Sequence, residues 1–66
     1  MTITLNGDSR ELAEGTTIDS LLVELKLTPD KVAVELNRRL VRGDKYDTGL
    51  KAGDVVEVVT FVGGGA

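Results

Sequence analysis

The stretch VVEVVTFVGGGA, residues 55–66, decides the fold of this 66-residue chain. Residues 55–62 are almost all β-branched or aromatic, as in a β-strand, and their only charge is Glu57. Residues 63–66 are three glycines and an alanine, which have no side chain large enough to pack against a core. We therefore expect a long strand over residues 55–62 and a flexible tail over residues 63–66. Such a tail, about 13 Å long when extended, can enter a narrow cleft on another protein.

The start of the chain predicts a β-hairpin. Residues 2–6 alternate between polar and apolar side chains, as a half-buried strand does. Asn6 and Gly7 follow at once and are a strong signal for a type I′ turn, because both central residues of that turn need positive φ. We therefore expect residues 9–13 to return antiparallel to the first strand, with Leu12 facing inward.

A single helix is predicted after this hairpin. Thr17 is a suitable N-cap, because its hydroxyl can accept from a free backbone N–H, and Asp19 suits the positive end of the helix dipole. Apolar side chains then recur at helical spacing, and they are Ile18, Leu21, Leu22 and Leu25. The apolar stripe covers one face only, so we expect two to three turns that lie on a sheet and end before Pro29.

Two further strands are predicted between the helix and the end of the chain. Residues 31–37 alternate again, and their inward side chains are Val32, Val34 and Leu36. Residues 37–39 indicate a tight turn into a short strand over residues 40–41. Residues 44–49 have no sustained period and predict a loop or one helical turn, followed by Leu50 as an anchor in the core.

These elements predict an α+β fold with one domain over residues 1–62. If the first and last strands lie side by side and parallel at the centre of the sheet, one helix covers the inner face and buries every apolar stripe. That arrangement is the β-grasp (ubiquitin-like) fold, a mixed four- to five-stranded sheet packed on one main helix. Val56 and Val58 then face the core, whereas Val59 and Phe61 are exposed on the opposite face.

Composition excludes several functions. The chain has no cysteine and no histidine, so it lacks thiolate ligands, a cysteine nucleophile and the usual general base. Its net charge of −3 and its two aromatic residues, one tyrosine and one phenylalanine, argue against nucleic-acid binding. We see neither a secretory signal nor a membrane-spanning stretch. We therefore expect a cytoplasmic protein that is not an enzyme by itself, binds no metal and contacts no membrane.

The chain resembles the ubiquitin-like sulfur carrier family over essentially its whole length, and most closely the members of the thiamin pathway. The matching segments are ITLNG (3–7), TTIDSLL (16–22), VAVELN (32–37), LKAGD (50–54) and VEVVTFVGGG (56–65). Members of that family act through a C-terminal Gly-Gly carboxylate. The resemblance assigns this pair to Gly64 and Gly65, with Gly63 in the tail and Gly65 as the carrier residue. Ala66, which follows Gly65, departs from the pattern.

The resemblance also implies a mechanism and partners. In the family, an E1-like adenylyltransferase uses ATP to adenylate the terminal glycine, and sulfur from a cysteine desulfurase route displaces AMP. The resulting thiocarboxylate donates sulfur to thiazole synthase, and the carrier itself binds no cofactor. Carriers for molybdopterin, cysteine or a siderophore-like product share the fold and tail, although the molybdopterin type usually has an F-F-P-P-like segment before Gly-Gly. A ubiquitin-like binding module or protein modifier without sulfur chemistry is the alternative from another class.

Docking is expected on the outward face next to the tail. Val59, Phe61 and Val62 are the predicted partner-binding residues, because exposed apolar side chains beside a reactive tip favour a partner surface. Three arginines lie in or near the predicted turn at residues 37–39, and they are Arg38, Arg39 and Arg42. They could complement an acidic partner, although such clusters are more often solvated turns. We expect the free carrier to be a monomer.

Overall fold

The computed structural model describes residues 1–61, which form five strands, one α-helix and two short 3₁₀ helices. In chain order they are β1 (Thr2–Leu5), β2 (Asp8–Glu11), α1 (Ile18–Glu24), η1 (Pro29–Lys31), β3 (Val32–Leu36), β4 (Arg39–Val41), η2 (Gly43–Lys45) and β5 (Val55–Thr60). The predictions made for Val62 and for residues 63–66 lie outside the described residues.

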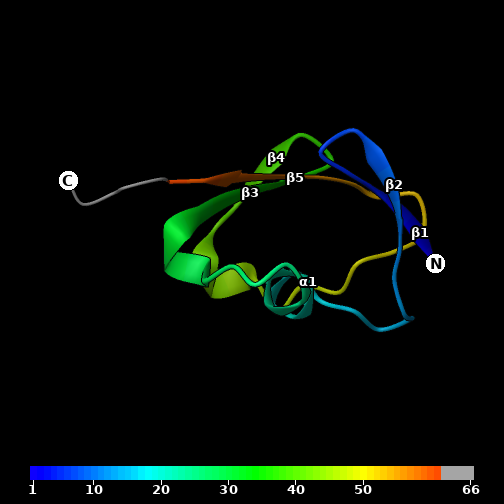
Figure 1. Ribbon diagram of the computed structural model, residues 1–66, viewed down its shortest axis with the longest axis horizontal. Helices are drawn as coiled ribbons and strands as arrows, with labels where there is room; N and C mark the ends of the chain where they lie inside the picture. Colours follow the sequence, from blue (N-terminus) through cyan, green and yellow to red (C-terminus); the bar gives the residue numbers. More distant parts are fainter. Residues whose placement is uncertain (62–66) are drawn as a thin grey trace.

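The five strands form one mixed sheet in the order β2-β1-β5-β3-β4. The last strand, β5, is central; it runs parallel to β1 and antiparallel to β3. Helix α1 crosses one face of this sheet, and the other face carries no helix within the described residues (Figure 1). The predicted β-grasp arrangement is therefore confirmed, with the first and last strands paired at the centre.

The first hairpin turns as predicted, with φ of 50° at Asn6 and 87° at Gly7. Both values are positive, as a type I′ turn requires. Because the turn has only two residues, Leu5 pairs directly with Asp8, so β2 begins one residue earlier than predicted and ends at Glu11. Leu12, just beyond β2, is buried as expected.

Helix α1 begins as predicted and ends differently. The Thr17 hydroxyl accepts a hydrogen bond from the Ser20 N–H (3.1 Å), which is the expected N-cap. The helix has seven residues, about two turns, and ends because Lys26 adopts a left-handed conformation (φ 61°) rather than because of Pro29. Lys26 N–H and the next N–H donate to the carbonyls of Val23 (3.0 Å) and Leu22 (2.9 Å), which is a Schellman motif.

The core lies between α1 and the inner face of the sheet. Its buried side chains are Ile3, Leu12, Ile18, Leu21, Leu22, Val32, Val34, Tyr46, Leu50, Val56 and Val58. The helix stripe and the inward residues of β3 and β5 therefore meet as predicted, and Leu50 anchors the preceding loop. Tyr46 was not predicted to be buried: it follows η2, and its carbonyl accepts the N–H of Asp19 in the first turn of α1 (2.9 Å).

Two asparagine side chains fasten β5 to the two hairpin turns. The Asn6 amide both accepts from the Val58 N–H (2.8 Å) and donates to the Val58 carbonyl (3.2 Å), 52 residues further along the chain. The Asn37 amide accepts from the Val55 N–H (2.8 Å) and donates to Asp54 (3.1 Å). Each side chain thus makes hydrogen bonds that the backbone of a neighbouring strand would otherwise make, at a point where the strand pairing ends.

Strand β5 is shorter than the sequence predicted. It ends at Thr60, and Phe61 follows outside the strand, although the Phe61 N–H still donates to the Lys31 carbonyl at the start of β3 (2.9 Å). The antiparallel partner β3 begins only at Val32, after the 3₁₀ helix η1, so the ladder has no further residues to pair with beyond this point.

Candidate functional site

The candidate site is the outer face of the sheet, which we define as the face turned away from α1, at the end of β5. Residues alternate across this strand. Val56 and Val58 are buried against the core, whereas Val59 and Phe61 are 58% and 54% exposed. The strand parity assigned from the sequence is therefore confirmed, although no partner is present to test the binding role of these residues. Val62, the third residue of that prediction, lies outside the described residues.

Other exposed apolar side chains share this face. Val59 pairs with Ala33 on β3, and Leu40 on β4 pairs with Glu35. Paired residues of neighbouring strands point to the same face. Because Ala33 and Glu35 share that parity, Leu40 joins Val59 on the outer face, where it is 68% exposed. The outer face thus carries apolar side chains from three adjacent strands.

Two carboxylates lie within this apolar surface. Glu35 on β3 pairs with Glu57 on β5, so both side chains project from the outer face at the same rung. Like charges directly opposite one another are unfavourable. Among the ion pairs formed by residues 1–61, none involves either glutamate. The outer face is therefore apolar near the end of β5 and acidic one rung earlier.

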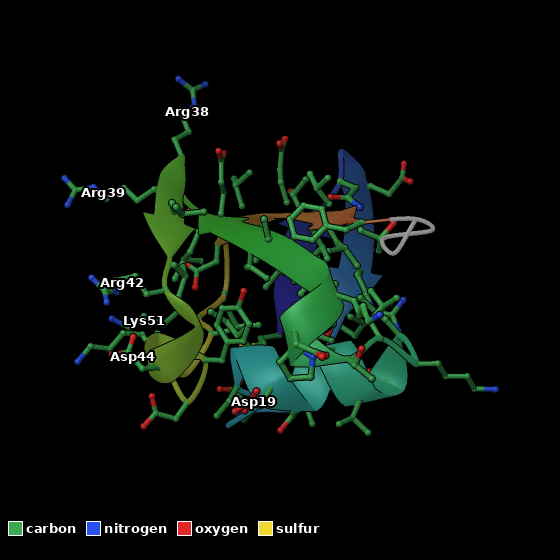
Figure 2. All side chains as sticks on the ribbon, turned by 90° about the vertical axis from the view of Figure 1, so that its left-hand side faces the viewer. Asp19, Arg38, Arg39, Arg42, Asp44 and Lys51 are labelled. Carbon is green, nitrogen blue, oxygen red and sulfur yellow. The ribbon has the colours of Figure 1, made fainter. Side chains whose placement is uncertain are left out.

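The three arginines lie elsewhere on the sheet. Arg38 is in the β3–β4 turn, which is level with the start of β5 and hence at the opposite end of that strand from Phe61. Figure 2 shows Arg38, Arg39 and Arg42 pointing outward along the β4 edge rather than toward one another. Arg42 makes a loose ion pair with Asp44 (3.7 Å). The structure does not bring the arginines next to the exposed pair Val59 and Phe61.

The described residues offer few groups for chemistry. Within residues 1–61 there is no pocket, and no cluster of three His, Cys, Asp or Glu side chains is placed to hold a metal ion. The hydroxyl of Thr2, at 2.6 Å, lowers the pKa of Glu11, and the N-terminal ammonium lowers it further through a hydrogen bond and its charge. Glu11 lies on β2, which β1 separates from β5. No helix in this part of the chain is long and apolar enough to cross a membrane.

Sequence reasoning missed part of this surface. It named the inward residues of β3 but did not predict that Glu35 pairs with Glu57 on the outer face, and it did not single out Leu40. The register between β3 and β5 decides which of their residues are paired, and the amino-acid sequence alone does not show it. The alternating pattern of each strand does indicate which of its residues are exposed. The structure shows that the exposed residues of neighbouring strands lie on one face.

The mixed sheet with its last strand at the centre, packed on one helix, defines a β-grasp domain. Solved structures with this fold are similar to this chain. The crystal structure of the thiamine biosynthesis protein ThiS from Geobacter metallireducens has a TM-score of 0.82 and 38% identity, covering 98% of this chain and all of that one. The solution structure of a thiamine biosynthesis protein from the same organism has a TM-score of 0.80 and 37% identity, covering 100% of this chain and 90% of that one.

The sequence comparisons define the family. Residues 3–65 match the ThiS family. The sulfur carrier protein ThiS of Thermus thermophilus is 44% identical over 62 residues, which are 92% of this chain and 95% of that protein. The chain belongs to the ThiS family, a family of small sulfur carrier proteins.

Two longer relatives carry a similar domain. A thiazole synthase of Magnetococcus marinus is 46% identical over 66 residues, covering 98% of this chain and 20% of that protein. A thiazole synthase of Paramagnetospirillum magneticum is 37% identical over 67 residues, covering 100% of this chain and 21% of that protein. The chain therefore spans about a fifth of the length of these two relatives.

Proposed function

We propose that this chain carries sulfur as a thiocarboxylate on Gly65 for thiazole formation in thiamin biosynthesis. The observation that carries the proposal is the ThiS family match, which runs through residue 65 and so includes the three consecutive glycines. The fold supports it, because the central strand β5 leads from the core toward these glycines. In this proposal Gly65 is the adenylated residue, Gly64 completes the reactive pair and Gly63 belongs to the tail.

The chemistry requires activation by a partner. A terminal carboxylate has a pKa of about 3.5, so at neutral pH it is an anion and a poor electrophile. Gly65 has a free carboxylate only once the peptide bond to Ala66 has been hydrolysed. An E1-like adenylyltransferase would then transfer AMP from ATP to the Gly65 carboxylate and release pyrophosphate. Sulfur delivered from a cysteine desulfurase route would then displace AMP and leave the thiocarboxylate. Glycine suits this step, because a β-carbon would crowd the approach inside the partner. The carrier binds no cofactor of its own, and ATP is used by the activating enzyme.

The activating enzyme is proposed to dock on the outer face at the end of β5. Val59 and Phe61 expose apolar surface there, and in the sequence Val62 is the residue between Phe61 and the glycines. Desolvation of exposed apolar side chains is a common source of binding energy at interface centres. The buried side chains of the same strand hold this surface in place, and we propose that the free carrier presents it as a folded monomer.

Thiazole synthase is the proposed sulfur acceptor. Two relatives with that name contain a stretch similar to this chain within a protein about five times as long. A carrier domain in the same polypeptide as its acceptor would raise their effective concentration. Separate carrier and acceptor chains would achieve the same transfer by docking. Because the route starts from ATP and sulfur taken from cysteine, we propose a cytoplasmic location.

Intact-mass measurement tests the proposal directly. The chain ending at Gly65 is incubated with ATP, a sulfur source and the activating enzyme of the same organism, and a matched sample omits ATP. The ATP sample should gain the mass difference between sulfur and oxygen, and adding thiazole synthase with its other substrates should reverse it. No sulfur gain contradicts a carrier role, and isopeptide bonds to lysines would indicate a protein modifier. A loaded carrier that discharges only to molybdopterin or cysteine synthesis would reassign the pathway.

A further inference from the structure

Backbone groups of β5 alternate between its two neighbouring strands. On the β3 side, the Phe61 N–H donates to the Lys31 carbonyl (2.9 Å), and the Val55 carbonyl accepts from the Asn37 N–H (2.7 Å). In an antiparallel ladder, alternate residues bond to the same neighbour. The odd-numbered residues of β5 therefore bond toward β3, and the even-numbered residues direct their backbone groups toward β1.

Among residues 1–61, only some of the β5 backbone groups that face β1 have hydrogen-bond partners. Strand β1 pairs with β5 at two positions, Thr4 with Val55 and Leu5 with Val56. The chain then turns away at Asn6, whose N–H donates to the Val56 carbonyl (2.9 Å). The Asn6 side chain continues the ladder by one further step, through its two hydrogen bonds to the backbone of Val58.

Thr60 is the next residue of β5 whose backbone faces the β1 side. Its partner in the β3 register is Val32, at a position where the backbone groups of an antiparallel pair point away from one another. Among the residues that the structure describes, no hydrogen bond to the Thr60 N–H or carbonyl comes from the β1 side, and Thr60 is exposed. The central strand thus has an open rung directly before Phe61 and the tail.

We propose that an extended segment of the adenylating partner pairs with the backbone of Thr60, as an added strand in the place that β1 leaves free. The inference rests on the proposed function and names where the partner holds the carrier. Continuity with the proposed docking surface supports this occupant, because Val59 and Phe61 flank Thr60 and expose apolar side chains. Strand addition draws its affinity from main-chain hydrogen bonds and its specificity from alternate side chains. We therefore expect a segment with apolar residues at alternating positions.

Pairing at Thr60 would also let the partner fix how far the terminal carboxylate extends into its active site. Adenylation needs the carboxylate close to its productive position, because a misplacement of about 1 Å can slow a reaction by about a hundredfold. Main-chain hydrogen bonds at Thr60 would fix the register of the chain five residues before Gly65, whereas side-chain contacts alone would allow it to slide.

Replacing Thr60 by proline tests whether the partner pairs with its backbone. Thr60→Pro removes an N–H that has no partner among residues 1–61, and proline is tolerated where a strand N–H faces outward. The matched control is Thr60→Ala, which keeps the N–H and loses only the side chain. With both chains ending at Gly65, we expect Thr60→Pro to fold and to raise the half-saturating carrier concentration in ATP–pyrophosphate exchange by about three- to tenfold. Thr60→Ala should match the unsubstituted chain.

A second variant covers the case in which proline disturbs the fold or the direction of the chain. The 66-residue length allows chemical synthesis of a carrier with an ester in place of the Thr60 amide, which removes the N–H and keeps the side chain. An ester at Val58 is the control, because it removes an N–H used inside the fold and should lower the Tm without raising the half-saturating concentration of folded carrier. An unchanged half-saturating concentration for the Thr60 ester overturns the open-rung proposal alone.

Two other outcomes separate the remaining possibilities. If the unsubstituted chain ending at Gly65 supports no exchange, the proposed function fails, and the pairing proposal that rests on it fails with it. If sedimentation shows an unsubstituted dimer that Thr60→Pro dissociates, a second copy of the chain occupies the rung and the proposal is overturned.

Discussion

The two faces of β5 differ in what they contribute. On the inner face Val56 and Val58 are 0% and 8% exposed and belong to the core. On the outer face, one residue further along, Val59 and Phe61 are more than half exposed. Both sets are apolar, so composition does not separate them; only strand parity and the position of α1 do. We infer that the inner face supplies stability and the outer face supplies recognition, within one six-residue strand and the residue that follows it.

The largest effect on stability is expected from the inner face. Val34→Ala or Leu21→Ala should lower the free energy of unfolding by about 2–4 kcal/mol, because each side chain is fully buried and its loss leaves a cavity in a small core. Chemical denaturation followed by circular dichroism measures the change. The control is Leu40→Ala on the outer face, which should cost less than about 0.5 kcal/mol. Losses that small at both inner positions would show that the helix and β3 do not pack as described.

A charge on the outer face should act on binding instead. Phe61→Asp should leave the Tm nearly unchanged and weaken binding to the activating enzyme by about tenfold or more, because it puts an unpaired charge into an apolar contact. Titration calorimetry measures the affinity. The matched control is Val23→Asp, which changes another exposed valine, on α1 and thus on the opposite side of the sheet. Equal affinity for Phe61→Asp and the unsubstituted chain would remove Phe61 from the docking surface.

Much of the fold could be predicted because local pattern and tertiary structure agree. Alternation identified the strands, Asn6 with Gly7 identified the first turn, and Thr17 identified the start of the helix. The helix end was predicted less well, since Lys26 takes a left-handed conformation that glycine usually adopts. Tyr46 was missed as a core residue because it stands in a polar loop without a period.

The site was less predictable because it depends on contacts between distant residues. The hydrogen bonds between Asn6 and Val58 join residues that are 52 positions apart, and no local sequence pattern predicts them. The rung at Thr60 follows from where β1 stops relative to β5, which is a matter of register. The functional assignment of Gly65 came from resemblance rather than from geometry, because glycines offer no side-chain signal.

A change that touches neither face should have the smallest effect. The two hairpin turns both use positive φ, but the second has Arg38 (φ 72°) where the first has Gly7. Arg38→Gly should raise the free energy of unfolding by about 0.5–1 kcal/mol, because the relief of left-handed strain exceeds the entropy cost of glycine. Denaturation measures the gain, and exchange activity should stay unchanged. A loss of activity would extend the docking surface to this turn.

Gly65 is the proposed reactive residue, and chains of different length test this directly. ATP–pyrophosphate exchange with the activating enzyme should therefore be compared for chains ending at Ala66, Gly65 and Gly64. The first places its carboxylate at most about 3.6 Å too far along and adds a methyl group, so its exchange should be slower by orders of magnitude. The chain ending at Gly65 should exchange readily, and the one ending at Gly64 should be inactive with unchanged Tm. Equal exchange by the chains ending at Ala66 and Gly65 would contradict the assignment.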